Sequence, residues 1–261
     1  MGPVFTLESP TRAIATEFAA GPWDPGLQHG GAPSALICWA VEQLPSAVPM
    51  RIARLTVDLL RPVPIGPIDI ETEVVREGRK IQVCSARLLA NGVEVVRASL
   101  QKVRIEPVDP PPETLQPMDL PLPDVGQAPP EALFDLAPRP GFTKGMSLRE
   151  VKGAWRDPGP AAIWFRRDGD FIQDEATTPV MKAAQVADFP NGVSNWLDFS
   201  QWSFINGDMT MNLARMPVGD WICLDADSYL GDEGAGVAFG RLGDEQGWFG
   251  RTVQSLVIER R

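Results

Sequence analysis

An aspartate near the end of an apolar, helix-like stretch has the clearest catalytic potential in this sequence. Met181, Gln185 and Asp188 follow one another at spacings of four and three, so a helix running through VMKAAQVADF carries them on one face. A carboxylate on a helix surrounded by sheet must be paired or must shift its pKa, and such groups act as general bases. Alternatively, Asp188 simply ends the helix and faces water. The residues alone leave both interpretations open.

A second chemical feature is His29-Gly30-Gly31, which precedes the stretch APSALICWAVEQL. Glycines at a helix start let a ligand approach the backbone closely, and the exposed N–H groups there favour developing negative charge. His29 is the only histidine, and it either lines a pocket or merely caps the helix. One histidine and three scattered cysteines supply no metal-ligand cluster, so we predict neither a metal nor a cofactor. No GxSxG motif is present, which disfavours a serine hydrolase.

The sequence contains an internal repeat. Thr56–Gly66 reads TVDLLRPVPIG and Thr210–Gly219 reads TMNLARMPVG, with Thr56 matching Thr210 and Arg61 matching Arg215 at an offset of 154. After a one-residue deletion, Gly66 matches Gly219 and Gln101 matches Gln254 at an offset of 153. The register predicts two related units in tandem, and a duplicated fold often places its site where the halves meet.

Composition and proline content define the overall organisation. The chain has 261 residues, 44% of them hydrophobic, and a net charge of −10, which disfavours nucleic-acid partners. Eleven of the 26 prolines lie between Pro107 and Pro140, which predicts an extended strap. We therefore expect an N-terminal repeat over residues 1–106, a proline-rich linker over 107–140 and a C-terminal repeat over 141–261. Scattered cysteines, no signal peptide and no apolar run of membrane-spanning length favour a cytoplasmic protein.

Each half shows the pattern of one buried helix followed by antiparallel strands. Residues 35–41 are apolar on every side, so the first helix is expected to be covered all round. Asn91-Gly92 signals a hairpin, and the turn 244–247 occupies the same place in the second half. The strands are expected at 55–60, 68–75, 81–89 and 93–105, then at 208–214, 221–229, 236–242 and 248–258. Less regular strand signals cover 5–18, 142–155 and 161–165, and Asn191-Gly192 is expected to stop the second helix. This is an α+β plan in which a sheet wraps around a helix.

Several local sequences resemble the acyl-CoA thioesterase II-type family, which has the double hot-dog fold. They are QHGGAPSAL, LLRPVPIG and ASLQ in the first half, and VADF, NGDMTMNLARMPVGDW and TVQSLV in the second. The resemblance implies a site in the second repeat made of an Asp on the central helix, a Thr or Ser, and a Gln near the chain end. Asp188 and Gln254 match the first and last, whereas Asn206 stands at the hydroxyl position.

The resemblance implies hydrolysis of an acyl-CoA thioester, a role in fatty-acid metabolism. Asp188, Gln254 and Asn206 would hold a water, with Asp188 as general base, and His29, Gly30 and Gly31 would bind the substrate. One site per chain is expected, because the first helix offers no acid within residues 35–41. The partner is thus a small acyl-CoA, and a homodimer or larger homo-oligomer is expected from fold analogy.

Two other functions compete with hydrolysis. A non-catalytic acyl-CoA or fatty-acyl binding protein is favoured by Asn206, which replaces the expected hydroxyl. An enoyl-CoA hydratase is suggested by Asp24 and His29, although the residues between them lack the Asn-Pro of such enzymes.

Overall fold

The computed structural model describes residues 1–124, 141–155 and 157–261. Its first half contains β1 (Phe5–Ser9), β2 (Arg12–Ala15), the 3-10 helix η1 (Glu17–Ala19), α1 (Gly31–Glu42), β3 (Met50–Leu59), β4 (Gly66–Arg76), β5 (Ile81–Ala90) and β6 (Val93–Arg104). A second 3-10 helix, η2 (Pro112–Thr114), lies in the connection. The second half contains α2 (Gly141–Lys144), β7 (Met146–Lys152), β8 (Ala161–Arg167), α3 (Pro179–Ala187), α4 (Pro190–Val193), β9 (Trp202–Asn206), β10 (Asp208–Leu213), β11 (Ile222–Leu230), β12 (Ala235–Asp244) and β13 (Gly247–Arg260).

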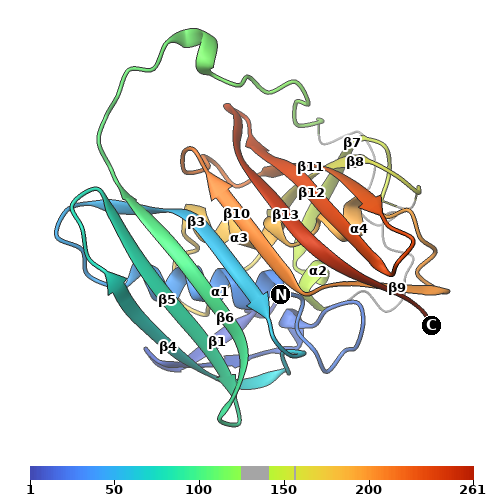
Figure 1. Ribbon diagram of the computed structural model, residues 1–261, viewed down its shortest axis with the longest axis horizontal. Helices are drawn as coiled ribbons and strands as arrows, with labels where there is room; N and C mark the ends of the chain where they lie inside the picture. The colour runs from blue at the N-terminus through green and yellow to red at the C-terminus, as the bar shows by residue number, and fades with distance from the viewer. Residues whose placement is uncertain (125–140, 156) are drawn as a thin grey trace.

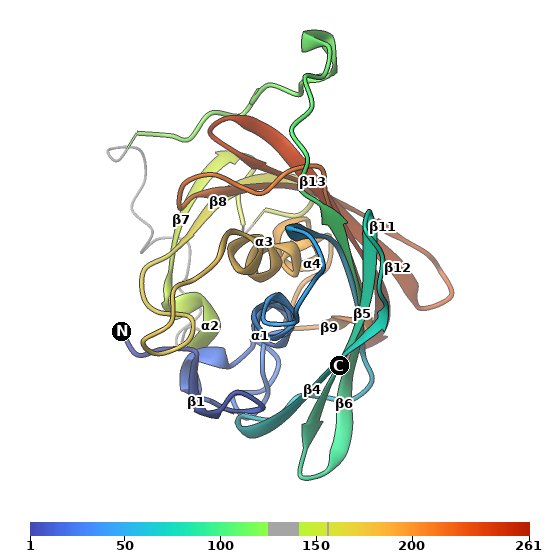
Figure 2. The same ribbon diagram turned by 90° about the vertical axis from the view of Figure 1, so that its left-hand side faces the viewer.

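The strands form one continuous antiparallel sheet that curls around the helices (Figure 2). The strand order is β1-β2-β4-β5-β6-β3-β10-β13-β12-β11-β8-β7, and β9 pairs with the C-terminal part of β13. The two halves lie side by side, joined through β3 and β10 (Figure 1). None of the helices in the described residues is both long and apolar enough to cross a membrane.

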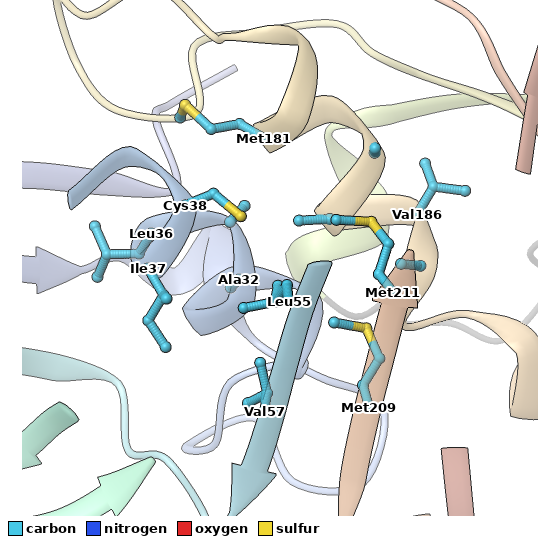
Figure 3. Close-up of a cluster of buried hydrophobic side chains, with 14 of the residues drawn as sticks. Ala32, Leu36, Ile37, Cys38, Leu55, Val57, Met181, Val186, Met209 and Met211 are labelled. Carbon is cyan, nitrogen blue, oxygen red and sulfur yellow. The ribbon is translucent and has the colours of Figure 1, made fainter. Parts of the chain in front are cut away.

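The core lies between this sheet and the helix pair α1 and α3. From Gly31 to Val41 every residue of α1 is buried, as its all-round apolar sequence predicts. Figure 3 shows the junction of the halves, where Leu55 and Val57 of β3 and Met209 and Met211 of β10 face the helices. One shared core therefore fixes the start of α1 and the end of α3 relative to each other.

A pseudo-two-fold relation passes through the β3–β10 pair. Thr56 and Thr210, which match in the sequence repeat, are direct cross-strand partners, with 3.2 Å between their Oγ1 atoms. Leu55 pairs with Met211 and Val57 with Met209, so the matched segments run antiparallel across the junction. The two repeated sequence segments therefore pair with each other at the junction between the two units.

The sheet register corrects one sequence match. Thr56 pairs with Ser99 in β6, and its counterpart Thr210 pairs with Val253 in β13. Ser99 and Val253 are thus equivalent, which makes Leu100 the counterpart of Gln254. The expected pairing of Gln101 with Gln254 is wrong by one residue, and in a strand one residue moves a side chain to the opposite face.

Most predicted strands are confirmed, and the differences are local. The segment 5–18 holds two short strands and η1, and 142–155 begins with the helical turn α2. Helix α3 ends at Ala187, one residue before Asp188, which is its C-cap. Asn191 and Gly192 lie inside the short helix α4 rather than ending α3, because Pro190 starts a new turn there. Strand β9 had no sequence prediction.

The connection between the halves contacts the second half from Gln116 onward. Trp164 Nε1 donates to the Leu120 carbonyl (3.0 Å), and Trp248 Nε1 donates to Asp119 (2.8 Å). The Trp248 N–H donates to the Gln116 carbonyl (2.9 Å). Residues 116–120 thus lie against the second half, whereas residues 107–115, including η2, are exposed, and the remainder of the predicted linker, 125–140, lies outside the described residues.

Candidate active site

The Asp188 carboxylate lies at the centre of a buried polar cluster built from both halves. As the C-cap of α3 it points away from the helix, and it is 4% exposed. Its Oδ1 accepts hydrogen bonds from Asn206 Nδ2 and Gln254 Nε2, each at 2.9 Å. Its Oδ2 lies 3.0 Å from Nδ1 of His29. The three residues expected to act together are thus in contact, together with His29 from the first half.

The two amide groups are fully used by the protein. Gln254 Nε2 also donates to the Asp188 carbonyl at 3.2 Å, and its Oε1 accepts from the Asn191 N–H at 3.3 Å. Asn206 Nδ2 also donates to the Asp208 carbonyl at 3.2 Å. Each –NH2 group has two hydrogens, so neither keeps one for another partner. The amides therefore hold and orient the carboxylate, and Oδ2 is the oxygen left to face a reactant.

His29 joins the first half to this cluster. Its ring stacks on Phe142 (4.7 Å between centroids) and contacts Phe189 (4.4 Å), and its side chain is 9% exposed. Nδ1 lies between Asp188 Oδ2 and the Gly31 N–H, which is 3.1 Å away. Nδ1 accepts from the Gly31 N–H when the ring proton is on Nε2, and it donates to Asp188 Oδ2 only when it carries the proton itself. His29 therefore both lines the cavity and caps the start of α1.

Gly30, at the start of α1, lies directly beside the carboxylate. A β-carbon at this position would lie 2.7 Å from Oδ2 of Asp188, so only glycine leaves room for it. The Gly30 N–H has no hydrogen-bond acceptor among the described residues, while the Gly31 N–H is bonded to His29. The start of α1 thus offers one unsatisfied donor beside the carboxylate, where a developing oxyanion would be stabilised.

A cavity of about 1020 Å³ opens onto this cluster. Its wall includes His29, Gly30, Asp188 and Asn206. Much of the remaining wall is aromatic, formed by Trp23, Trp155, Phe189, Trp196, Phe199 and Phe204. Aromatic side chains of this kind suit an apolar substrate group, with a few polar residues left to fix its orientation.

The charged residues around the cavity are mostly acidic. Among the described residues, Asp24, Asp157, Asp198 and Glu259 line it together with the cation Arg61. Arg261 stacks on Trp23 and Phe199 at the same wall. Asp24 accepts from the Gly26 N–H (2.7 Å), and it forms no ion pair or hydrogen bond with His29 within the described chain. The Asp24–His29 pair suggested for a hydratase is therefore not assembled in this structure.

Sequence reasoning identified Asp188, Gln254, Asn206, His29, Gly30 and Gly31, and the structure brings all six into one region. Sequence reasoning did not anticipate the contact between His29 and Asp188, because nothing in the sequence relates positions so far apart in different repeats. It also missed the Asn191 N–H that fixes Gln254. No group of three or more potential metal-ligating side chains occurs within the residues described.

Family comparison matches nearly the whole chain. The acyl-CoA thioesterase N-terminal domain matches residues 19–101, and the acyl-CoA thioesterase C-terminal domain matches residues 112–258. The chain belongs to the acyl-CoA thioesterase family. Membership confirms the resemblance drawn from the sequence and makes the protein a thioester hydrolase. No curated protein matches this sequence.

Three solved structures of comparable length are similar in fold to this acyl-CoA thioesterase. Acyl-CoA thioesterase II from Mycobacterium marinum is 12% identical, with a TM-score of 0.67 and 94% and 96% of the two chains covered. The TesB protein of Mycobacterium avium subspecies paratuberculosis is 16% identical (TM-score 0.68, 98% and 95% covered). A hot-dog protein from Alicyclobacillus acidocaldarius is 15% identical (TM-score 0.69, 98% and 95% covered). At these identities they show the fold alone, and the expected double hot-dog architecture is confirmed.

Proposed function

We propose that this protein hydrolyses acyl-CoA thioesters to a free acid and CoA, using a water activated by Asp188. The observation that carries the proposal is the position of Asp188. Its Oδ1 is held by two amide donors at 2.9 Å, while Oδ2 faces His29 and the start of α1 at the wall of an apolar cavity. A carboxylate fixed in this way is preorganised to accept a proton from a bound water.

The reaction follows from these positions. Water bound at Asp188 Oδ2 attacks the thioester carbonyl carbon, and its proton passes to that oxygen as the new C–O bond forms. The negative charge that develops on the carbonyl oxygen is stabilised by the Gly30 N–H at the α1 start. The intermediate then collapses as the C–S bond breaks, and Asp188 returns the proton to the departing sulfur.

Each remaining residue has a supporting role in this proposal. Gln254 and Asn206 hold Asp188 in place and so act as positioning residues. When Nδ1 carries the ring proton, His29 donates to Oδ2 in place of accepting from the Gly31 N–H, and so keeps the carboxylate turned toward α1 and the substrate carbonyl. The aromatic wall with Trp155 and Phe189 accommodates the acyl group. A non-catalytic acyl-binding role would need the same cavity but not the buried carboxylate cluster.

The test is release of free CoA from a panel of acyl-CoAs of different chain length and branching, followed with a thiol reagent. We expect turnover of at least one acyl-CoA, and the Asp188→Asn variant should lower kcat by about 10²–10⁴-fold with the fold intact. The matched control is Asp232→Asn on an exposed turn, which should keep wild-type rates. Binding without any CoA release across the whole panel would instead establish the acyl-binding alternative.

A further inference from the structure

A second cavity, of about 310 Å³, lies beside α3 and shares no lining residue with the first. It is enclosed by the end of β8, the middle of α3 and the loop that precedes α3. Its polar residues are Arg167, Thr177, Lys182, Gln185 and Asp220. The first cavity has an acidic lining, whereas this one contains two cations.

The guanidinium of Arg167 is rigidly held at this cavity. Nε donates to Oε1 of the buried Gln185, and Nη2 donates to the Phe142 carbonyl at 3.1 Å. Gln185 is itself fixed, since its Nε2 donates to the Met181 carbonyl. The guanidinium also lies over the Phe142 ring, 4.6 Å from its centroid. A β-carbon at Gly145 would come within 2.6 Å of Nη1, so glycine there makes room for the group.

The positive charge of Arg167 is not met by an ion pair, and Asp168 attracts it only over a longer distance. No carboxylate of the described residues lies within ion-pair distance of it, and Nη1 has no acceptor among them. The nearby Asp168 is used by Arg166 and Ser147. Burial lowers the pKa of Arg167 to about 10, which reflects the cost of keeping an unpaired cation there. At neutral pH the group nevertheless stays charged.

Lys182 adds a second donor group at the rim. Its Nζ donates to Asp220 (2.7 Å) and to the Gly219 carbonyl (3.0 Å), and 25% of its side chain is exposed. The Asp220 side chain is 72% exposed, so solvent screens its attraction for Lys182 and the ammonium charge is only partly neutralised. The cavity therefore contains one half-buried cation without an ion pair, an ammonium that is paired with Asp220, and Thr177.

We propose that this second cavity binds a phosphate group, with the guanidinium of Arg167 and the ammonium of Lys182 as its cationic donors. A planar, preorganised guanidinium matches the geometry of phosphate oxygens, and pairing with a dianion would offset the buried charge. The volume leaves space beyond a bare phosphate, so a phosphate monoester fits the site. The phosphate comes either from a free anion or from CoA.

The test is calorimetric titration of the full chain with inorganic phosphate, in buffer free of other oxyanions and at constant ionic strength. Wild type should bind saturably, Lys182→Gln should raise Kd by at least about five-fold, and Arg167→Met should abolish binding. The matched control is Lys152→Gln, since Lys152 pairs with Asp225 on the sheet surface and should leave Kd unchanged. Saturable binding that both cavity variants leave unchanged, or its absence in wild type, would overturn the proposal.

Lys182→Gln serves as the decisive variant if Arg167→Met fails to fold, because the lysine lies at the rim. Competition between phosphate and CoA then separates the two sources: displacement assigns the site to a phosphate of CoA, and its absence to a free phosphate. These measurements detect binding without turnover, so they stand whether or not the protein hydrolyses thioesters.

Discussion

Replacement of Gly30 by alanine is a direct test of the geometry around Asp188. Gly30 has φ −60° and ψ −22°, so alanine fits its backbone without strain. The new β-carbon would lie 2.7 Å from Oδ2 and 2.9 Å from Oδ1 of Asp188. Ordinary contact begins at 3.4 Å, so the carboxylate must recede by roughly 0.7 Å. The backbone N–H at position 30 is kept in this variant, and only the place of the carboxylate changes.

The size of the effect follows from the bonds that hold Asp188. The amide bonds of 2.9 Å and the His29 contact of 3.0 Å cannot lengthen by roughly 0.7 Å and remain hydrogen bonds. A misplacement near 1 Å costs about 100-fold in rate, so we expect kcat to fall by about 30- to 100-fold. Overpacking should also lower the free energy of unfolding by about 1–3 kcal/mol.

Two measurements check this expectation: kcat from the release of CoA, and the free energy of unfolding from urea denaturation. Gly192→Ala in α4 is the stability control, because its added methyl would meet only the Trp155 ring, at 3.6 Å. That variant should unfold at the wild-type urea concentration or higher. A Gly30→Ala enzyme with wild-type kcat would refute the reasoning, since hydrolysis would then not depend on where the Asp188 carboxylate lies.

Three further predictions concern Asn206, Asp244 and the cysteines. Asn206→Thr should keep kcat within about ten-fold, because a hydroxyl can also donate to Asp188, whereas Asn206→Leu should lose about 10²-fold by the same CoA-release assay. Burial disfavours the charge of Asp244, yet hydrogen bonds from Arg215 and from backbone N–H groups outweigh it, and its pKa lies below the ordinary value. Asp244 therefore stabilises the fold above about pH 4 and loses this contribution as pH falls through its lowered pKa; in acid unfolding curves Asp244→Asn should lack this loss. Burial raises the pKa of every thiol, so native protein should not react with a thiol reagent until unfolded, at any of Cys38, Cys84 and Cys223.

Elements with strong local signals were predictable from the sequence. Helix α1 followed from its unbroken apolar run, which only a position enclosed by sheet can accommodate. The hairpin at Asn91-Gly92 followed from residues that tolerate positive φ, and the structure has 51° and 76° there. Strand β9 was missed because its pairing partner is the end of β13, which no local pattern reveals.

The parts of the site that were not predictable depend on long-range register. The match of Gln101 with Gln254 rested on residue type alone, and only the register of β3 with β6 and of β10 with β13 makes Leu100 the counterpart. Similarly, His29 and Asp188 meet only because α1 and α3 pack together around the pseudo-two-fold relation. Composition and spacing can identify such residues singly, but not the contact between them.

The two ends of the α1–α3 pair each carry an acid, but in different surroundings. At one end the C-cap of α3, Asp188, meets the N-cap of α1, Gly30. At the other, Glu42 at the end of α1 meets Thr178, the N-cap of α3, whose Oγ1 donates to it at 2.7 Å. An acid is therefore present at both ends. The second end lacks the glycine that leaves space for a reactant, and buried Leu100 stands where Gln254 donates at the first. The glycine and the amide therefore distinguish Asp188, which is buried at the cavity wall, from Glu42, which is exposed at the opposite end of the helix pair.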